Sequence, residues 1–114
     1  LMSESDVVSI HVPLNESTRG MLNKKMLSLM KISAVLINVA RGGLVDEVVL
    51  KRMLKNNLLA GAAFDVFANE PPRDTELLLL PNFLATPHIG GSSEEAVLAM
   101  GRAAIRGLDI NSLP

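Results

Sequence analysis

Three side chains of complementary chemistry follow apolar segments of this chain: Arg41, Glu70 and His88. A guanidinium can bind a carboxylate through paired hydrogen bonds, and a histidine beside a carboxylate can move a proton near neutral pH. Together the three suit an enzyme that acts on a small carboxylic acid. No other feature of the sequence points to a specific chemistry.

Each of these residues also has a plainer interpretation. Arg41 could be a surface arginine in a turn, His88 a hydrogen-bonded loop residue and Glu70 a solvated glutamate. We favour a functional role for Arg41, because it follows the apolar run Ala34–Val39 and precedes two glycines that let the backbone approach a ligand. Pro87 restricts the backbone before His88, and two glycines soon after it leave space, which favours function there too. For Glu70 the two interpretations are equally supported.

Three further polar residues have alternatives of their own. Asp65 lies in the apolar segment Ala62–Phe67, where it could accept a hydrogen bond from a ligand amide or bind backbone amides at the strand end. We interpret His11 as structural or as part of a pocket wall, and Ser92 as a helix cap rather than a nucleophile. The histidines and carboxylates lack the spacing of metal ligands, so no metal site is expected.

The elements that must position these residues alternate between strand and helix patterns. Apolar runs predict strands at Val7–Val12, Ala34–Val39, Leu59–Phe67 and Phe83–Thr86. Capping residues predict helices from Asn23 to about Met30, after Asp46, and from a capping box at Ser92–Glu95 to near Gly107, with a loop or short helix at Leu77–Leu80. This order predicts an α/β fold, a parallel sheet with flanking helices, in which Ala34–Val39 is covered on both faces. Because parallel strands end at one edge, Arg41, Asp65 and His88 are expected to converge there.

Composition limits the classes of protein to consider. The chain has 114 residues, 48% of them hydrophobic, which allows a core within one domain or less. A net charge of −1 and 3% aromatic residues argue against nucleic acid as a partner, and no apolar run is long enough for a membrane span. The absence of cysteine and the acidic start Leu1–Asp6, unlike a secretory signal, are compatible with a cytoplasmic location, which we expect.

The glycine-rich turn that cradles the pyrophosphate of a dinucleotide, Gly-x-Gly-x-x-Gly, does not occur in this sequence. If the protein uses a dinucleotide, that turn lies upstream of Leu1. We therefore expect residues 1–114 to be part of a longer dinucleotide-binding domain. As an isolated piece it should be inactive and should self-associate through an open sheet edge.

Four motifs, in order, resemble the D-isomer-specific 2-hydroxyacid dehydrogenases. They are Ser5–Leu14, Leu36–Glu47, Ala62–Phe67 with Glu70-Pro71, and Thr86–Gly91. The resemblance implies a Rossmann-like fold and places the chain in the second half of the NAD-binding domain. It also implies an oxidoreductase, with NAD or NADP as cofactor, that transfers hydride between nicotinamide and a D-2-hydroxy or 2-oxo acid, and a homo-oligomer.

The same resemblance implies roles for individual residues. Arg41 would bind the carboxylate and carbonyl oxygen of the substrate, His88 would be the acid/base, and Glu70 would orient it. The residues bordering the nicotinamide and its ribose would be Val39, Ala40, Arg41, Asp65, His88, Gly90 and Gly91.

A second function class shares this fold. Corepressor proteins use nucleotide binding to control assembly, and they keep Arg41, Glu70 and His88, so these residues cannot separate an enzyme from a sensing and interaction module. Turnover of 2-oxo acids would separate them.

Overall fold

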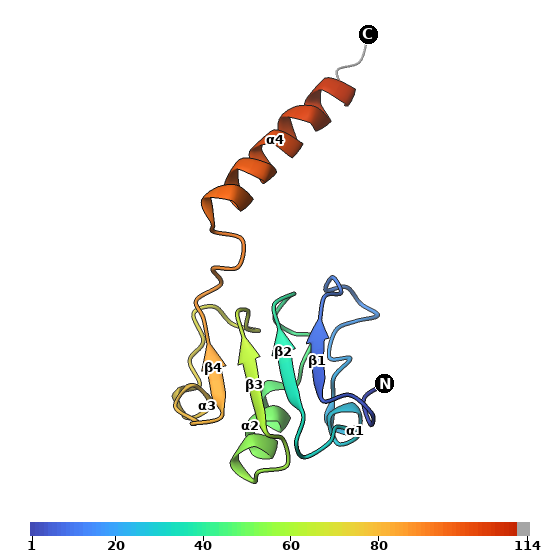
Figure 1. Ribbon diagram of the computed structural model, residues 1–114, viewed down its shortest axis with the longest axis vertical. Helices are drawn as coiled ribbons and strands as arrows, with labels where there is room; N and C mark the ends of the chain where they lie inside the picture. Colours follow the sequence, from blue (N-terminus) through green and yellow to red (C-terminus); the bar gives the residue numbers. More distant parts are fainter. Residues whose placement is uncertain (112–114) are drawn as a thin grey trace.

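The computed structural model describes the backbone of residues 1–111 and the side chains of residues 1–108. Strands and helices alternate along these residues as the sequence predicts (Figure 1): β1 Val7–Ile10, α1 Lys24–Leu27, β2 Val35–Asn38, α2 Glu47–Lys55, β3 Gly61–Phe64, α3 Thr75–Leu78, β4 Phe83–Ala85 and α4 Glu94–Asn111.

The four strands form one parallel sheet in the order β1-β2-β3-β4. Near their carboxyl ends, Ile10 pairs with Asn38, Asn38 with Phe64, and Phe64 with Ala85. The strands therefore stop at nearly the same level, and the segments that follow them rise from one edge (Figure 1). The predicted convergence of the strand ends is confirmed.

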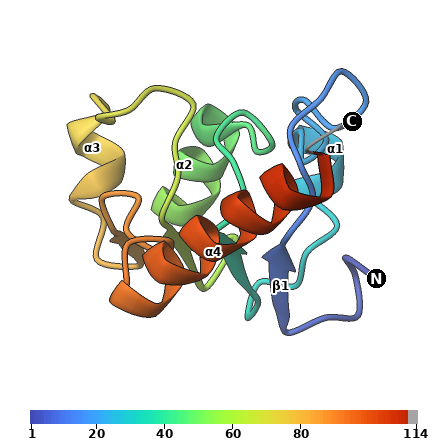
Figure 2. The same cartoon turned by 90° about the horizontal axis from the view of Figure 1, so that it is seen from above.

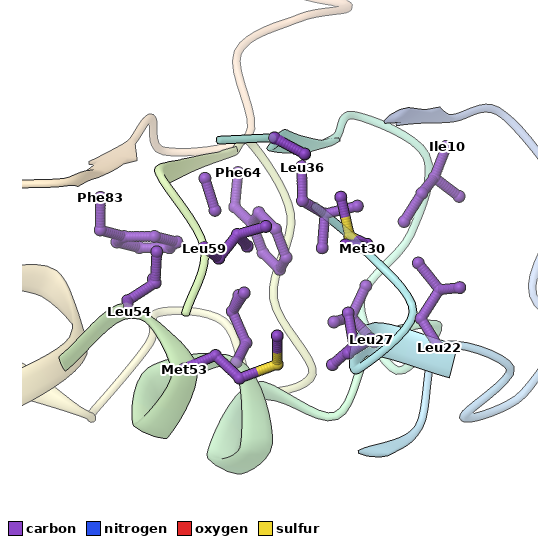
Figure 3. Packing of buried hydrophobic residues seen from close by; sticks show 14 of the residues in the cluster. Ile10, Leu22, Leu27, Met30, Leu36, Met53, Leu54, Leu59, Phe64 and Phe83 are labelled. Carbon is purple, nitrogen blue, oxygen red and sulfur yellow. The ribbon is translucent and has the colours of Figure 1, made fainter. Parts of the chain in front are cut away.

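The sheet has one covered face and one open face. Helices α1, α2 and α3 lie on the same side of it (Figure 2). The core of buried apolar side chains lies between these helices and the sheet (Figure 3). Ile10, Leu36 and Phe64 point into this core (Figure 3). The alternate side chains of Val7 and Leu84 are 57% and 63% exposed.

The prediction that the second strand is covered on both faces is therefore wrong for the part of the chain described here. Leu36 and Asn38 are buried, whereas Val35 and Ile37 on the other face are only half-buried. The continuous apolar run reflects a strand whose second face needs a cover that these residues do not supply.

Each strand is shorter than predicted, and β2 shows why. The side chain of Asn38 donates to the carbonyl of Arg41 (3.0 Å) and accepts from the amide of Ala40 (3.2 Å), so it closes a turn directly after the strand. Val66 and Phe67 remain buried, but they lie beyond β3, where the chain turns into a loop.

Two predicted caps are confirmed. Asn23 accepts from the amide of Met26 at the start of α1, and Asp46 accepts from the amides of Val48 and Val49 at the start of α2. Helix α1 ends earlier than predicted, at Leu27. After it, the amides of Leu29 and Met30 bond to the carbonyls three residues back (3.1 and 3.0 Å), so the chain tightens into a turn and the α-helix stops.

Helix α3 is the short helix expected near Leu77–Leu80. Asp74 caps it by accepting from the amide of Leu77, and the Leu77 side chain is buried. The apolar run therefore fixes a surface connection to the core, as predicted.

Helix α4 differs from the prediction at both ends. Ser93, rather than Ser92, caps it by accepting from the amide of Ala96 (3.2 Å). The helix passes through Gly107 to Asn111, because Gly107 does not adopt the positive φ of a terminating glycine. It extends away from the sheet beyond the strand ends (Figure 1), with Val97 and Met100 exposed.

Candidate active site

Asp65 organises the turn that carries His88. It is buried and follows β3 directly, and it accepts from the Thr86 hydroxyl (2.5 Å) and from the amides of Ile89 (2.9 Å) and Gly90 (2.8 Å). The Thr86 hydroxyl and then these amides hold the pKa of Asp65 below its ordinary value, so the carboxylate stays ionised. Of the two predicted roles, the structure shows the second, binding amides of its own chain.

These contacts hold His88 in a conformation that side chains seldom adopt. Its φ is 55°, in the left-handed region, which costs a non-glycine residue about 1–2 kcal/mol. The two amides that follow His88 both donate to Asp65, and these charge-assisted bonds offset the strain. A strained residue that its surroundings hold in place is typical of a functional site.

Glu70 and His88 form a hydrogen-bonded pair. Glu70 Oε2 lies 2.8 Å from His88 Nδ1, and Glu70 Oε1 accepts from the amide of Phe67 (3.1 Å). The bond to His88 and then the Phe67 amide lower the pKa of Glu70, so the carboxylate is the acceptor and Nδ1 the donor. Nε2 is thereby left to exchange a proton with a ligand. The functional interpretation of Glu70, undecided from sequence, fits this geometry.

A cavity of about 200 Å³ lies beside the pair and is lined by Glu70, His88, Asp65 and Thr86 among others. His11 is elsewhere: its Nε2 lies 2.8 Å from the Ser9 hydroxyl, and it lines a mainly apolar cavity of about 440 Å³ beside β1. The hydrogen-bonded Glu70–His88 pair and the larger cavity are therefore separate features of this chain.

Arg41 lies on the same edge but is not brought into contact with the pair. It is exposed, and within the described residues its Nη1 donates to the carbonyl of Ala40 (2.6 Å). Arg41 follows β2 and His88 follows β4, with β3 between them, so about 10 Å separates the two strand ends. That spacing leaves room for a small ligand between guanidinium and imidazole.

The sequence predicts that the two glycines after Arg41 let the backbone approach a ligand, but the structure gives them other roles. A Cβ on Gly42 would lie 1.8 Å from the carbonyl oxygen of Phe67, so the close approach is to the chain's own loop. Gly43 has a φ of 81°, which a turn requires and glycine permits.

The structure adds Thr86 and Glu47 to the residues found from the sequence. Thr86 donates to Asp65, and Glu47 accepts from the amide of Ala68 (2.8 Å). The sequence offered weak signals for both: a hydroxyl at a strand end, and an acid in the first turn of a helix.

The edge fits one end of a dinucleotide. Val39 is 46% exposed at the end of β2, and a Cβ on Gly91, beyond β4, would meet no atom within 4 Å, so both positions on this edge are open to a ligand. Within the described residues, no Gly-x-Gly-x-x-Gly turn is present to hold the phosphates. These residues fit the nicotinamide end alone.

A parallel sheet with helices packed against it and polar side chains at its carboxyl edge defines the class: a Rossmann-like α/β domain. The family "D-isomer specific 2-hydroxyacid dehydrogenase, NAD binding domain" matches residues 1–90, and the chain belongs to this family. Within the part of the chain whose side chains are described, no cluster of His, Cys, Asp or Glu forms a metal site.

Individual relatives agree with this assignment. The chain is 48% identical over 100 residues to a glycerate dehydrogenase of Methylorubrum extorquens, covering 85% of this chain and 32% of the relative. A glyoxylate reductase from Paecilomyes thermophila superposes with a TM-score of 0.89 at 37% identity, covering 95% and 33%. A D-isomer specific 2-hydroxyacid dehydrogenase from Xanthobacter autotrophicus, in complex with NADPH and MES, has a TM-score of 0.74 at 39% identity, covering 77% and 29%. The chain thus spans about a third of the length of these relatives.

Proposed function

We propose that this chain is part of an oxidoreductase that moves a hydride between a nicotinamide cofactor and a D-2-hydroxy or 2-oxo acid. The observation that carries the proposal is the Glu70–His88 hydrogen bond of 2.8 Å at the carboxyl edge on which Arg41 also lies. Membership of the dehydrogenase family and the names of the relatives support the substrate class.

The proposed roles follow from the atoms that each side chain offers. Arg41 binds the substrate carboxylate and the carbonyl oxygen with its planar donors. His88 Nε2 gives its proton to that oxygen during reduction and takes it back during oxidation, while Glu70 holds Nδ1 and stabilises the imidazolium. When bound, the nicotinamide supplies or accepts the hydride at the carbon.

We propose NAD, with NADP as the alternative, as the cofactor. Val39, Ala40, Gly90 and Gly91 would border the nicotinamide and its ribose together with Arg41 and His88. Asp65 would take part mainly by fixing the Gly90 amide, because its oxygens already bind Thr86, Ile89 and Gly90. The residue that selects between the two cofactors belongs to the part of the fold that carries the glycine-rich turn.

We propose that the whole protein supplies that turn and a substrate-binding domain, so that residues 1–114 form part of the cofactor domain. The open sheet face and the exposed side of α4 support burial against further chain or a second copy, and we propose a homo-oligomer in the cytoplasm. Among the described residues, no helix is long and apolar enough to cross a membrane.

The experiment is to assay the full-length protein with a panel of 2-oxo acids and either NADH or NADPH. We expect turnover of at least one small 2-oxo acid, such as glyoxylate or hydroxypyruvate. Nucleotide binding without turnover of any panel member would overturn the proposal in favour of the corepressor-type module. The names of the relatives, dehydrogenases and reductases, favour the enzyme.

A further inference from the structure

Glu47 lies outside the pair but contacts the loop that carries half of it. It stands in the first turn of α2, and its Oε1 accepts from the amide of Ala68, 21 residues further along the chain (2.8 Å). The amide of the preceding residue, Phe67, donates to Glu70 Oε1. Two carboxylates thus bind consecutive amides of one loop, one from the helix and one from the site.

Gly42 also restricts the backbone at Phe67. Gly42 packs against the Phe67 carbonyl so closely that a Cβ there would lie 1.8 Å from its oxygen. The Phe67 side chain is buried in the core, whereas Ala68 is exposed. Glu47 therefore holds the chain at the point where the loop leaves the core, two residues before Glu70.

The surroundings of Glu47 disfavour its ionised form. Burial, together with the nearby charges of Asp74 and Asp46, raises the pKa of Glu47 above its ordinary value, and the Ala68 amide offsets this only in part. When the folded pKa of an acid is raised, its ionised form opposes folding above that pKa. The link between Glu47 and the site therefore rests on the geometry of its bond to the Ala68 amide rather than on its charge.

We propose that Glu47 is a positioning residue for proton transfer. It fixes the Phe67–Ala68 peptide, and this peptide in turn holds the Glu70 carboxylate within hydrogen-bonding distance of His88 Nδ1. The inference rests on the proposed function for its kinetic consequence only. The structural link from Glu47 to Glu70 stands whether or not the protein turns over a 2-oxo acid.

The test compares Glu47→Ala and Glu47→Gln in the full-length protein. Alanine removes the acceptor, and we expect kcat to fall about 10-fold with little change in the KM for the 2-oxo acid, since Arg41 is untouched. Glutamine keeps an acceptor oxygen for the Ala68 amide, so we expect kcat within about 3-fold of wild type. Glu76→Ala, which removes an acid that pairs with Lys51 and Lys55 on α2, is the matched control and should leave kcat unchanged.

The pH dependence of kcat/KM distinguishes a positioning role of Glu47 from a general loss of structure in the variant. In Glu47→Ala the Glu70 carboxylate is held less firmly, so its pKa should rise toward the ordinary value, and the acid limb of kcat/KM should move to higher pH. Among the described residues, Asp46 and Asp74 act on the pKa of Glu47, Arg73 lines a cavity with it, and Lys51 pairs with Asp74. His88 and Asp65 act on the pKa of Glu70, and Arg73 lines a cavity with it. The substitution alters none of these charged groups, so a shift of the acid limb between Glu47→Ala and wild type does not come from a change in their charges.

Hydrogen exchange gives a readout that needs no activity. In Glu47→Ala the Phe67 amide, which bonds to Glu70 and not to Glu47, should exchange faster than in wild type, and Glu47→Gln should restore its protection. A wild-type protein without turnover would overturn the proposed function and leave this measurement intact. Glu47→Ala with unchanged Phe67 exchange, or with wild-type kcat and acid limb, would overturn the positioning role.

Discussion

At the end of β4, Asp65 binds the Thr86 hydroxyl and the two amides that follow His88, and Glu70 binds the imidazole itself. At the end of β2, Arg41 is exposed, and within the described residues its guanidinium contacts only the carbonyl of Ala40. The two turns share one sheet edge, yet one is held by charge-assisted hydrogen bonds to carboxylates and the other by the neutral side-chain amide of Asn38.

This difference matches the two tasks that we propose. Proton transfer depends on the distance and angle between fixed groups, and a displacement of about 1 Å can cost 100-fold in rate. Binding a carboxylate depends on a charged fork that can adjust to its ligand. Under the proposed roles, the Glu70–His88 pair is formed before a ligand binds, whereas Arg41 takes its final orientation when the ligand binds.

Removing the imidazole should have the largest effect of the changes proposed here. In the full-length enzyme, we expect His88→Gln to lower kcat about 1,000-fold, because general acid–base catalysis is lost. Cofactor affinity should stay within about 2-fold, because little contact area is removed. Steady-state kinetics and a nucleotide titration measure the two effects. Near-normal turnover would remove His88 from the mechanism.

Gly42→Ala should disturb both turns together, because Gly42 follows Arg41 and packs against the Phe67 carbonyl. The added methyl would lie 1.8 Å from that oxygen, and we expect a loss of about 3 kcal/mol in the free energy of unfolding. Urea denaturation measures the loss. Gly101→Ala in α4, where a Cβ meets no atom within 4 Å, is the control and should not destabilise the protein.

Asp65→Asn tests how much the ionised carboxylate holds the His88 turn. The asparagine keeps one acceptor oxygen, and we expect a loss of about 2 kcal/mol at neutral pH. The pKa of Asp65 is lowered from 3.8, so its contribution is complete above that value and is lost as the pH falls through the folded pKa. The stability difference between wild type and variant should therefore shrink as the pH is lowered below about 4. A difference independent of pH would show that the charge is not what stabilises the turn.

Arg41→Lys should have the smallest effect, and it tests whether the turn after β2 serves to bind the substrate. Lysine keeps the charge but loses the planar fork, so we expect the KM for the 2-oxo acid to rise about 10-fold with a smaller change in kcat. If nicotinamide affinity fell instead, with substrate affinity unchanged, Arg41 would belong to the cofactor site rather than to the substrate. Fluorescence titration with NADH distinguishes these results.

Local patterns in the sequence determined much of this architecture. The order of strands and helices, the caps at Asn23 and Asp46, and the shared carboxyl edge depend on short-range periodicity and on residues within one turn of each other. Sequence placed Arg41, Asp65 and His88 on that edge for the same reason, because each follows an apolar run.

The tertiary structure decided which of these residues meet; among the pairs below, only the Glu70–His88 pair was expected, and it was expected from the family resemblance. Glu70 pairs with His88 across 18 residues, Asp65 binds the Gly90 amide across 25, and Glu47 reaches Ala68 across 21. No local pattern indicates which carboxylate meets the imidazole, or that Gly42 makes room for the chain's own loop rather than a ligand. Such pairings arise when the strands align in register and bring distant turns to one edge, so they depend on packing rather than on neighbours in sequence.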